Sequence, residues 1–227
     1  MAVELLEETL GVHFQDSTLL HMALTHRSYI YETQGEGLSS NERLEFLGDS
    51  ILAFVSTDFL YRTFPHLSEG ELTDVRAILV KTETLANFAQ DIQLGTFMLM
   101  GKGEQHSGGG KRVLASAFEA VLGAIFLDQG ITAVQQFLLH RLEPIAQHIV
   151  EKRLFKDNKS RFQELSQAHD SITPFYRLVS QEGPSHNREF TVEVMQGEIV
   201  AGRGHGRNKQ TAEQEAAYEA LVKRGWQ

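Results

Sequence analysis

The chain has no cysteine among its 227 residues. Disulfide bonds and thiol catalysis are therefore excluded, and the composition permits a reducing cytoplasm, where we expect the protein to act. Long hydrophobic runs are also missing, because no stretch approaches the roughly 20 apolar residues of a membrane span. The N-terminus is acidic and lacks a long apolar run, so it is not a signal peptide. We expect neither a membrane partner nor an organic cofactor.

An excess of basic residues is missing too. The net charge of -9 at pH 7 argues at first against a nucleic-acid partner. The acidic excess lies in one half, because residues 1–155 carry 11 basic and 20 acidic side chains, whereas residues 156–227 carry 10 of each. An RNA-binding surface in the second half must therefore come from local clustering. The acidic first half needs metal ions to approach a polyanion.

A stripe of carboxylates is present in residues 41–49, Asn-Glu-Arg-Leu-Glu-Phe-Leu-Gly-Asp. On a helix, Glu42, Glu45 and Asp49 fall within about 60° of one another. Three like charges on one stripe destabilise a helix unless a cation lies among them. Ligands that are all oxygens indicate Mg²⁺, with Mn²⁺ as a substitute. The alternative is a solvated helix face with Arg43 as a local partner.

Phe46 lies on the acidic side of this predicted helix. It projects about 40° from Glu42, whereas Leu44, Leu47 and Ile51 cluster on the opposite side and form the natural core face. A large aromatic side chain beside a charged site is more easily explained by a partner surface than by the chain's own core.

These residues resemble the signature of bacterial ribonuclease III, the double-strand-specific endoribonuclease. Residues 41–50 match that signature at every position, residues 24–29, 71–73 and 76–77 match its context, and residues 118–124 resemble its second acidic helix. The resemblance spans nearly the whole chain, including a C-terminal double-stranded-RNA-binding domain. It implies a magnesium-dependent enzyme that hydrolyses double-stranded RNA and leaves 5′-phosphates and short 3′ overhangs. Its expected roles are the processing of rRNA precursors, mRNA and tRNA.

The pattern of apolar residues predicts two domains. Residues 1–153 are expected to form an all-α domain, with helices over 41–62, 72–88, 114–127 and 131–150 and a flexible loop over 101–110. Residues 155–159 are typical of a short polar linker. Residues 158–227 are expected to form a small α+β domain with one antiparallel sheet, because they show the order helix, three strands, helix. The predicted ranges are 160–168, 175–181, 189–195, 198–203 and 209–223.

Glu119 is the lone carboxylate in an otherwise apolar helix. Burying an ionised carboxylate is expensive, so it needs a cation or an ion pair. An arginine such as Arg43 or Arg76 would serve, but the first stripe favours a metal. The resemblance implies an aspartate where this chain has Ser116, three residues earlier on the same face. Serine supplies an oxygen but no charge, so we expect weaker metal affinity and surviving activity.

The resemblance also implies a role for each acidic residue. The expected metal site is Glu45, Asp49, Ser116 and Glu119, and the expected catalytic residues are Asp49, Glu119 and Glu42. Glu42 would mainly orient ligands or water without binding the metal directly. Phe46 would plug a cavity on the second subunit of a homodimer. A two-fold dimer suits the pseudo-two-fold symmetry of a duplex, each subunit cutting one strand.

Three patches in the second half match the family's surface for double-stranded RNA. Such RNA is read by shape, through 2′-hydroxyls in the minor groove and phosphates across the major groove. The third patch has Lys209-Gln210 where the family has two adjacent basic residues, and the helix N-terminus there also attracts phosphate. The expected RNA-binding residues are Gln163, Glu164 and Gln167 in the first helix, His186 after the first strand, and Arg207, Asn208 and Lys209 before the last helix.

Two other classes of function stay open. One is a non-catalytic dimer that binds double-stranded RNA and has lost cleavage through Ser116. The other is an α-helical scaffold whose acidic residues only form salt bridges. The retained carboxylates at positions 42, 45, 49 and 119 favour an active enzyme over the first alternative, and the RNA-binding half disfavours the second.

Overall fold

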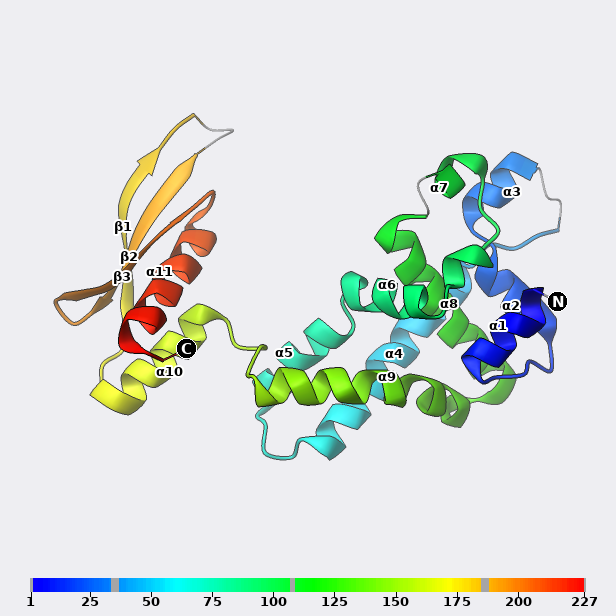
Figure 1. Ribbon diagram of the computed structural model, residues 1–227, viewed down its shortest axis with the longest axis horizontal. Helices are drawn as coiled ribbons and strands as arrows, with labels where there is room; N and C mark the ends of the chain where they lie inside the picture. Colours follow the sequence, from blue (N-terminus) through cyan, green and yellow to red (C-terminus); the bar gives the residue numbers. More distant parts are fainter. Residues whose placement is uncertain (1, 34–36, 107–108, 185–187, 227) are drawn as a thin grey trace. The chain divides into compact units, whose positions relative to one another are not determined.

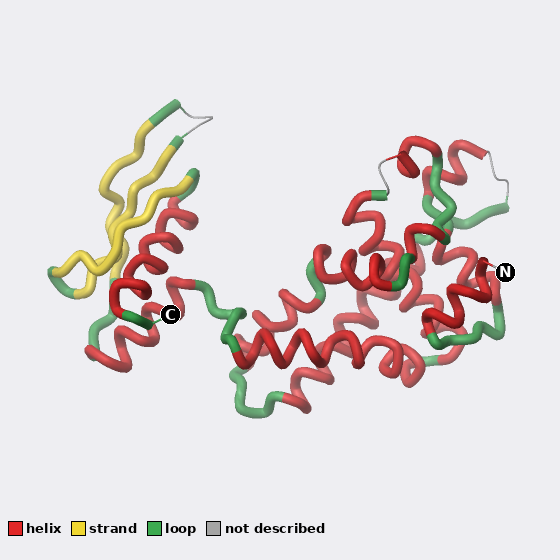
Figure 2. Tube along the Cα trace, in the orientation of Figure 1, coloured by secondary structure: helices red, strands yellow, loops and turns green. Residues whose placement is uncertain are grey.

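The computed structural model describes residues 2–33, 37–106, 109–184 and 188–226. The chain divides between Phe155 and Lys156 into two compact units. All three strands lie in the second unit, as the colours of Figure 2 show. The expected class, an all-α domain followed by a small α+β domain, is confirmed. Within the described ranges, no helix is long and apolar enough to cross a membrane.

In the first unit, helices α2, α4, α6 and α9 pack against one largely buried helix, α8 (Gly110–Gln129). Its core includes the fully buried side chains of Leu52, Phe118, Leu122 and Leu138. Figure 1 shows α4 and α8 in this unit. The other elements are α1 (Ala2–Leu10), α2 (Ser17–Leu24), α3 (Arg27–Thr33), α4 (Glu42–Thr63), α5 (Glu69–Leu79), α6 (Thr82–Asp91), η1 (Leu94–Thr96), α7 (Lys102–His106) and α9 (Ile131–Glu151).

The prediction of one helix over residues 72–88 is wrong, because the chain forms α5 and α6 instead. A capping box of Ser68 and Glu71 begins α5 three residues earlier than predicted. Between the helices the Thr84 hydroxyl donates a hydrogen bond to the Ile78 carbonyl oxygen at 2.8 Å. This bond stabilises the turn, and each helix then buries its own apolar face.

The prediction of an unbroken loop over residues 101–110 is also wrong, because this segment contains α7. The backbone amides of Glu104 and Gln105 both donate to the Gly101 carbonyl oxygen at 3.0 Å. The Gly101 amide in turn donates to the Ser28 hydroxyl at 2.9 Å. These local hydrogen bonds begin the helix and attach it to α3.

The second unit is a three-stranded antiparallel sheet in the order β1-β2-β3, with two helices packed against it. Phe162, Val194 and Leu221 lie in its small core. The order that the sequence predicts is therefore confirmed. The elements are α10 (Asn158–Asp170), β1 (Phe175–Glu182), β2 (Glu189–Gln196), β3 (Ile199–Gly206) and α11 (Lys209–Arg224).

Strand β3 and helix α11 lie in direct backbone contact. A Cβ atom on Gly204 would lie 2.2 Å from the Ala216 nitrogen and 2.3 Å from the Ala212 carbonyl oxygen. On Gly202 it would lie 2.3 Å from the Ala216 carbonyl oxygen. Glycines facing alanines therefore hold α11 close to the sheet and fix its N-terminus beside the end of β3.

Candidate active site

The crossing of α4 and α8 brings the two acidic segments together. Gly48 on α4 and Gly123 on α8 lie where the two backbones meet. A Cβ atom on Gly48 would lie 1.8 Å from the Glu119 carbonyl oxygen, and one on Gly123 would lie 2.4 Å from a carbonyl oxygen of α4. Only glycine fits at these two positions. Glu45 lies three residues before Gly48 and Asp49 directly follows it. Both are therefore held close to Glu119.

The pKa of Glu119 is raised by its position in this site. Burial raises the pKa of its carboxyl group from an ordinary 4.5 to about 7, and the negative charges of Asp49 and then Glu45 add to the rise. Glu119 and Glu45 are half-buried, whereas Asp49 is exposed. Each of these influences disfavours the ionised form of Glu119.

The arginine alternative for Glu119 finds no support in the described part of the chain. The Arg76 guanidinium donates to the Thr57 hydroxyl at 2.8 Å, and Arg43 is exposed. No cation is among the influences on the pKa of Glu119, all of which raise it. Among the described residues, no basic group therefore lowers the pKa of Glu119.

A divalent cation fits these carboxylates by donor chemistry and by charge. The oxygens of Glu45, Asp49 and Glu119 are of the type that Mg²⁺ and Mn²⁺ prefer. Such an ion would also offset the repulsion that raises the pKa of Glu119. Within the ranges that the structure describes, no group of three or more His, Cys, Asp or Glu side chains is already arranged to hold a metal ion. The three side chains would have to turn toward a shared centre.

Glu42 lies at the rim of the site, in the first turn of α4. Its carboxylate accepts a hydrogen bond from the Ser40 hydroxyl at 2.9 Å. The Arg27 guanidinium lies 3.4 Å from its other oxygen, and both side chains of this pair are exposed. Glu42 is thus oriented by neighbours from outside α4.

Ser116 lies in a pocket beside the carboxylates, with a volume of about 380 Å³. Sequence reasoning missed Glu104 and Arg112 in this pocket, because neither belongs to an acidic stripe and the helix that carries Glu104 was expected to be a loop. The lining residues are His26, Arg27, Asn41, Glu42, Glu45, Glu104, Arg112, Val113 and Ser116.

An aromatic stripe runs along the exposed side of α4. Phe46 is 79% exposed, Phe54 is 58% exposed and Tyr61 is 72% exposed. At about 100° per residue, the three side chains lie within roughly 80° of one another. Sequence reasoning identified Phe46 alone, although the spacing of the other two was readable. We call these three residues the α4 aromatic stripe.

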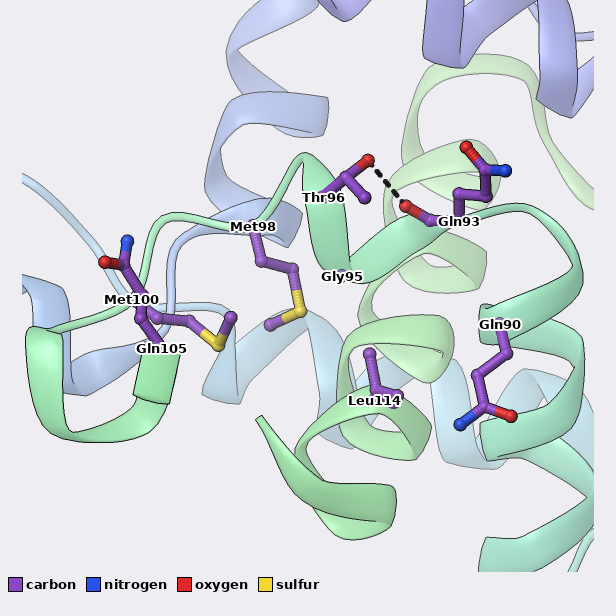
Figure 3. A pocket seen from close by; sticks show the side chains of 8 residues that line it. All are labelled: Gln90, Gln93, Gly95, Thr96, Met98, Met100, Gln105 and Leu114. Carbon is purple, nitrogen blue, oxygen red and sulfur yellow. Dashed lines mark hydrogen bonds between the residues drawn. The ribbon is translucent and has the colours of Figure 1, made fainter. Parts of the chain in front are cut away.

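A separate pocket, shown in Figure 3, lies beside η1 and the start of α8 and has a volume of about 550 Å³. The Thr96 hydroxyl donates to the Gln93 carbonyl oxygen at 2.9 Å across its rim. None of the described residues that line it is charged, so it suits neither a metal ion nor a phosphate. These residues are Gln90, Gln93, Gly95, Thr96, Met98, Met100, Gln105 and Leu114.

In the second unit, Gln163, Glu164 and Gln167 are exposed on one side of α10. The Lys156 ammonium donates to the Glu164 carboxylate at 2.6 Å. The Gln167 amide donates to the Thr173 hydroxyl at 3.1 Å. These contacts hold the polar side chains in place at the surface.

Asn208 is the N-cap of α11, because its side-chain oxygen accepts a hydrogen bond from the Thr211 amide at 2.8 Å. Its side-chain oxygen is thus used for the cap, which the sequence prediction did not foresee. Arg207 and Lys209 flank the cap, and both are exposed. The predicted RNA-binding residue His186 lies outside the described residues.

Comparison with known proteins shows the family. Residues 16–145 match the family model Ribonuclease-III-like, and residues 158–223 match the double-stranded RNA binding motif. Ribonuclease 3 of Pelotomaculum thermopropionicum is 44% identical over 221 residues, which is 96% of this chain and 92% of that protein. Ribonuclease 3 of Roseiflexus sp. is 47% identical over 224 residues, which is 97% of this chain and 94% of that protein.

A solved structure agrees with these relatives. The nuclease domain of ribonuclease III from Campylobacter jejuni is 38% identical, with a TM-score of 0.56, and the match covers 63% of this chain and 94% of that chain. The two family models and the full-length relatives together leave little of the chain unmatched. The chain therefore belongs to the ribonuclease III family and is an endoribonuclease with a double-stranded-RNA-binding domain.

Proposed function

We propose that this endoribonuclease is magnesium-dependent and cleaves double-stranded RNA by hydrolysis of its phosphodiester bonds. The observation that carries the proposal is the contact of α4 and α8 at Gly48 and Gly123, which holds Glu45 and Asp49 close to Glu119. We place the two functional domains at residues 1–153 and 158–227. Manganese is expected to substitute for magnesium.

Each acidic residue has its own part in the proposed reaction. Glu45, Asp49 and Glu119 would hold the cation, and Ser116 would contribute a neutral oxygen through a water molecule. When bound, the cation lowers the pKa of the attacking water and offsets the charge that develops on the phosphate. Glu42, held by Ser40, would orient water or ligands at the rim.

The raised pKa of Glu119 supports this assignment. A carboxyl group with a pKa of about 7 is partly protonated at neutral pH, and a divalent cation would compete with that proton. Glu119 is therefore better suited to a loaded site than to an empty one. Asp49 is the most exposed of the three proposed ligands.

The family supports a proposal for the products and the cellular roles. We propose products with 5′-phosphates and short 3′ overhangs, from rRNA precursors, mRNA and tRNA in the cytoplasm. The relatives at 44% and 47% identity, which bear the name Ribonuclease 3, support this part of the proposal.

We further propose a homodimer that docks through the α4 aromatic stripe. Phe46, Phe54 and Tyr61 expose a band of apolar surface, which is typical of an interaction site. A second structure of the Campylobacter jejuni nuclease domain is described by flexibility in a region involved in dimer formation. Phe46 would enter a cavity on the second subunit, and each subunit would cut one strand of the duplex.

The second unit is proposed to hold the duplex through three sets of side chains. Gln163, Glu164 and Gln167 on α10 would contact 2′-hydroxyls in one minor groove. Arg207 and Lys209 beside the start of α11 would contact phosphates, and the Asn208 cap would fix their position. His186 is expected to contact a second minor groove.

The second candidate function is a non-catalytic protein that binds double-stranded RNA. Two observations favour it: Ser116 supplies no charge, and the described residues contain no ready-made cluster of three metal ligands. The carboxylates that the Gly48 contact brings together weigh against it. A cluster of negative charges is unfavourable unless a bound cation offsets it.

The decisive experiment compares a long labelled RNA duplex with a single strand of the same sequence, in magnesium and in calcium. We expect discrete short duplex products in magnesium from the duplex alone. A duplex that is shifted on a gel but stays intact in magnesium and in manganese would favour the binding protein over the enzyme.

A further inference from the structure

The pocket beside the carboxylates contains a guanidinium group that has no partner among the described residues. Arg112 lies one turn before Ser116 on α8, so both side chains project from the same face of the helix. Both line the pocket of about 380 Å³, together with Glu45. Arg112 is exposed, and within the described ranges it forms no hydrogen bond or ion pair.

The neighbouring basic residues are used differently. The Lys111 ammonium, next to Arg112 in the chain, donates to the Glu83 carboxylate at 3.0 Å and does not line the pocket. Arg27, on the other side of the pocket, pairs with Glu42. Arg112 is therefore the basic side chain of this pocket that is available to a ligand.

The wall opposite α8 is fixed by hydrogen bonds between segments distant in the sequence. The His26 amide donates to the Leu99 carbonyl oxygen at 2.9 Å. The Lys102 amide donates to the Glu32 carboxylate at 2.7 Å. These bonds hold α3 and the residue before it against the start of α7 and the segment before it, which keeps this wall of the pocket in place.

We propose that Arg112 binds a phosphate of double-stranded RNA beside the carboxylates, and that its positive charge there partly replaces the charge of metal ions that a site with Ser116 holds less well. This inference rests on the proposed function. With a serine at position 116, the site has one negative charge fewer with which to collect metal ions. The guanidinium group of Arg112 supplies positive charge to the phosphate without a metal, and its planar fork matches phosphate oxygens.

The first test measures RNA binding without cleavage. Affinity for a labelled RNA duplex is measured in calcium across a series of salt concentrations. For Arg112→Ala, we expect the slope of log affinity against log salt to fall in magnitude by about 1, as for the loss of one phosphate contact. Arg112→Lys, which keeps the charge, should restore the slope. Lys111→Ala is the matched control and should leave the slope unchanged.

The second test separates this role from a structural one. In magnesium, Arg112→Ala should lower kcat/KM by about tenfold or more, the loss expected for a charge-assisted hydrogen bond. In a Ser116→Asp background the same substitution should cost much less, because the added carboxylate restores the charge that collects metal. Thermal unfolding of each variant confirms that it is folded.

The outcomes distinguish the two proposals. An Arg112→Ala variant that matches Lys111→Ala in both salt slope and kcat/KM would overturn the role of Arg112, as would an equal loss with Ser116 and with Asp at that position. If the unmodified protein binds the duplex but does not cleave it, the proposed function fails. The salt slope in calcium then still decides whether Arg112 contacts phosphate.

Discussion

Gly48 and Glu119 lie in direct backbone contact, since a Cβ atom on Gly48 would lie 1.8 Å from the Glu119 carbonyl oxygen. This contact determines how closely α4 and α8 approach. It thereby determines whether carboxylates on the two helices can share one cation. The glycine of the signature segment is thus a requirement of the proposed site as well as of the packing.

Gly48→Ala should destabilise the protein, because the added methyl group meets backbone and no flexible side chain can yield. We expect a loss of about 3 kcal/mol or more in the free energy of unfolding, or roughly 6 to 12 °C in melting temperature. Gly70→Ala is the matched control, since a Cβ atom at that helical position would meet nothing within 4 Å. Equal melting temperatures for the two variants would contradict the close approach.

The raised pKa of Glu119 predicts how stability depends on pH in the absence of metal. The folded protein keeps a proton on this group that the unfolded chain releases above pH 4.5. The stabilisation is full below pH 4.5 and is lost as pH rises through about 7. Melting temperature in EDTA should therefore fall more between pH 5 and pH 8 than it does in Glu119→Gln.

Magnesium should reverse this effect at pH 8, because the cation replaces the proton as the partner of the carboxylate. The gain in melting temperature with magnesium should be much smaller in Glu119→Gln. If both proteins show the same dependence on pH and on magnesium, the cluster around Glu119 is not the source.

Ser116→Asp should lower the magnesium concentration that cleavage requires. The added carboxylate lies three residues before Glu119 on the same helical face, so it strengthens binding of a divalent cation there. We expect half-maximal cleavage at a magnesium concentration several-fold lower, and a lower melting temperature in EDTA because of the added repulsion. Ser116→Asn, which adds a neutral side chain of similar size, should produce neither change. An unchanged magnesium requirement in Ser116→Asp would show that position 116 does not face the metal.

The α4 aromatic stripe predicts how the protein associates. Phe46→Glu should place a charge in the proposed interface and shift the protein from dimer to monomer in sedimentation at micromolar concentration. Tyr31→Glu is the control, because Tyr31 is 82% exposed but lies on α3. A protein that is monomeric without any substitution, or a Phe46→Glu variant that stays dimeric, would refute the proposed interface.

Much of the fold could be predicted from the sequence, because helical spacing is strong where one face is buried. The signature helix was expected over residues 41–62 and spans Glu42–Thr63. The boundary between α5 and α6 was missed, since apolar residues continue through the turn and the Thr84 hydroxyl stabilises it locally. The short helix α7 was missed because its glycine and its polar residues are equally typical of a loop.

The site could be predicted in part. The carboxylates of α4 could be predicted from their helical spacing, and Glu119 could be predicted because it is the lone carboxylate in an apolar helix. The position of Arg112 in the same pocket as Ser116 was not predicted, because the helix was expected to begin at residue 114 and α8 begins at Gly110. The use of the Asn208 side chain as a helix cap was also missed, although a capping residue before α11 could have been read from the sequence.

The most direct test of a metal site between α4 and α8 compares the unmodified protein with Glu119→Gln on one labelled RNA duplex in magnesium. We predict that Glu119→Gln binds the duplex with unchanged affinity and loses cleavage by at least about a hundredfold, because a ligand of the cation is gone while the RNA-binding unit is intact. Cleavage by Glu119→Gln at the rate of the unmodified protein would contradict a metal site built across the contact of α4 and α8.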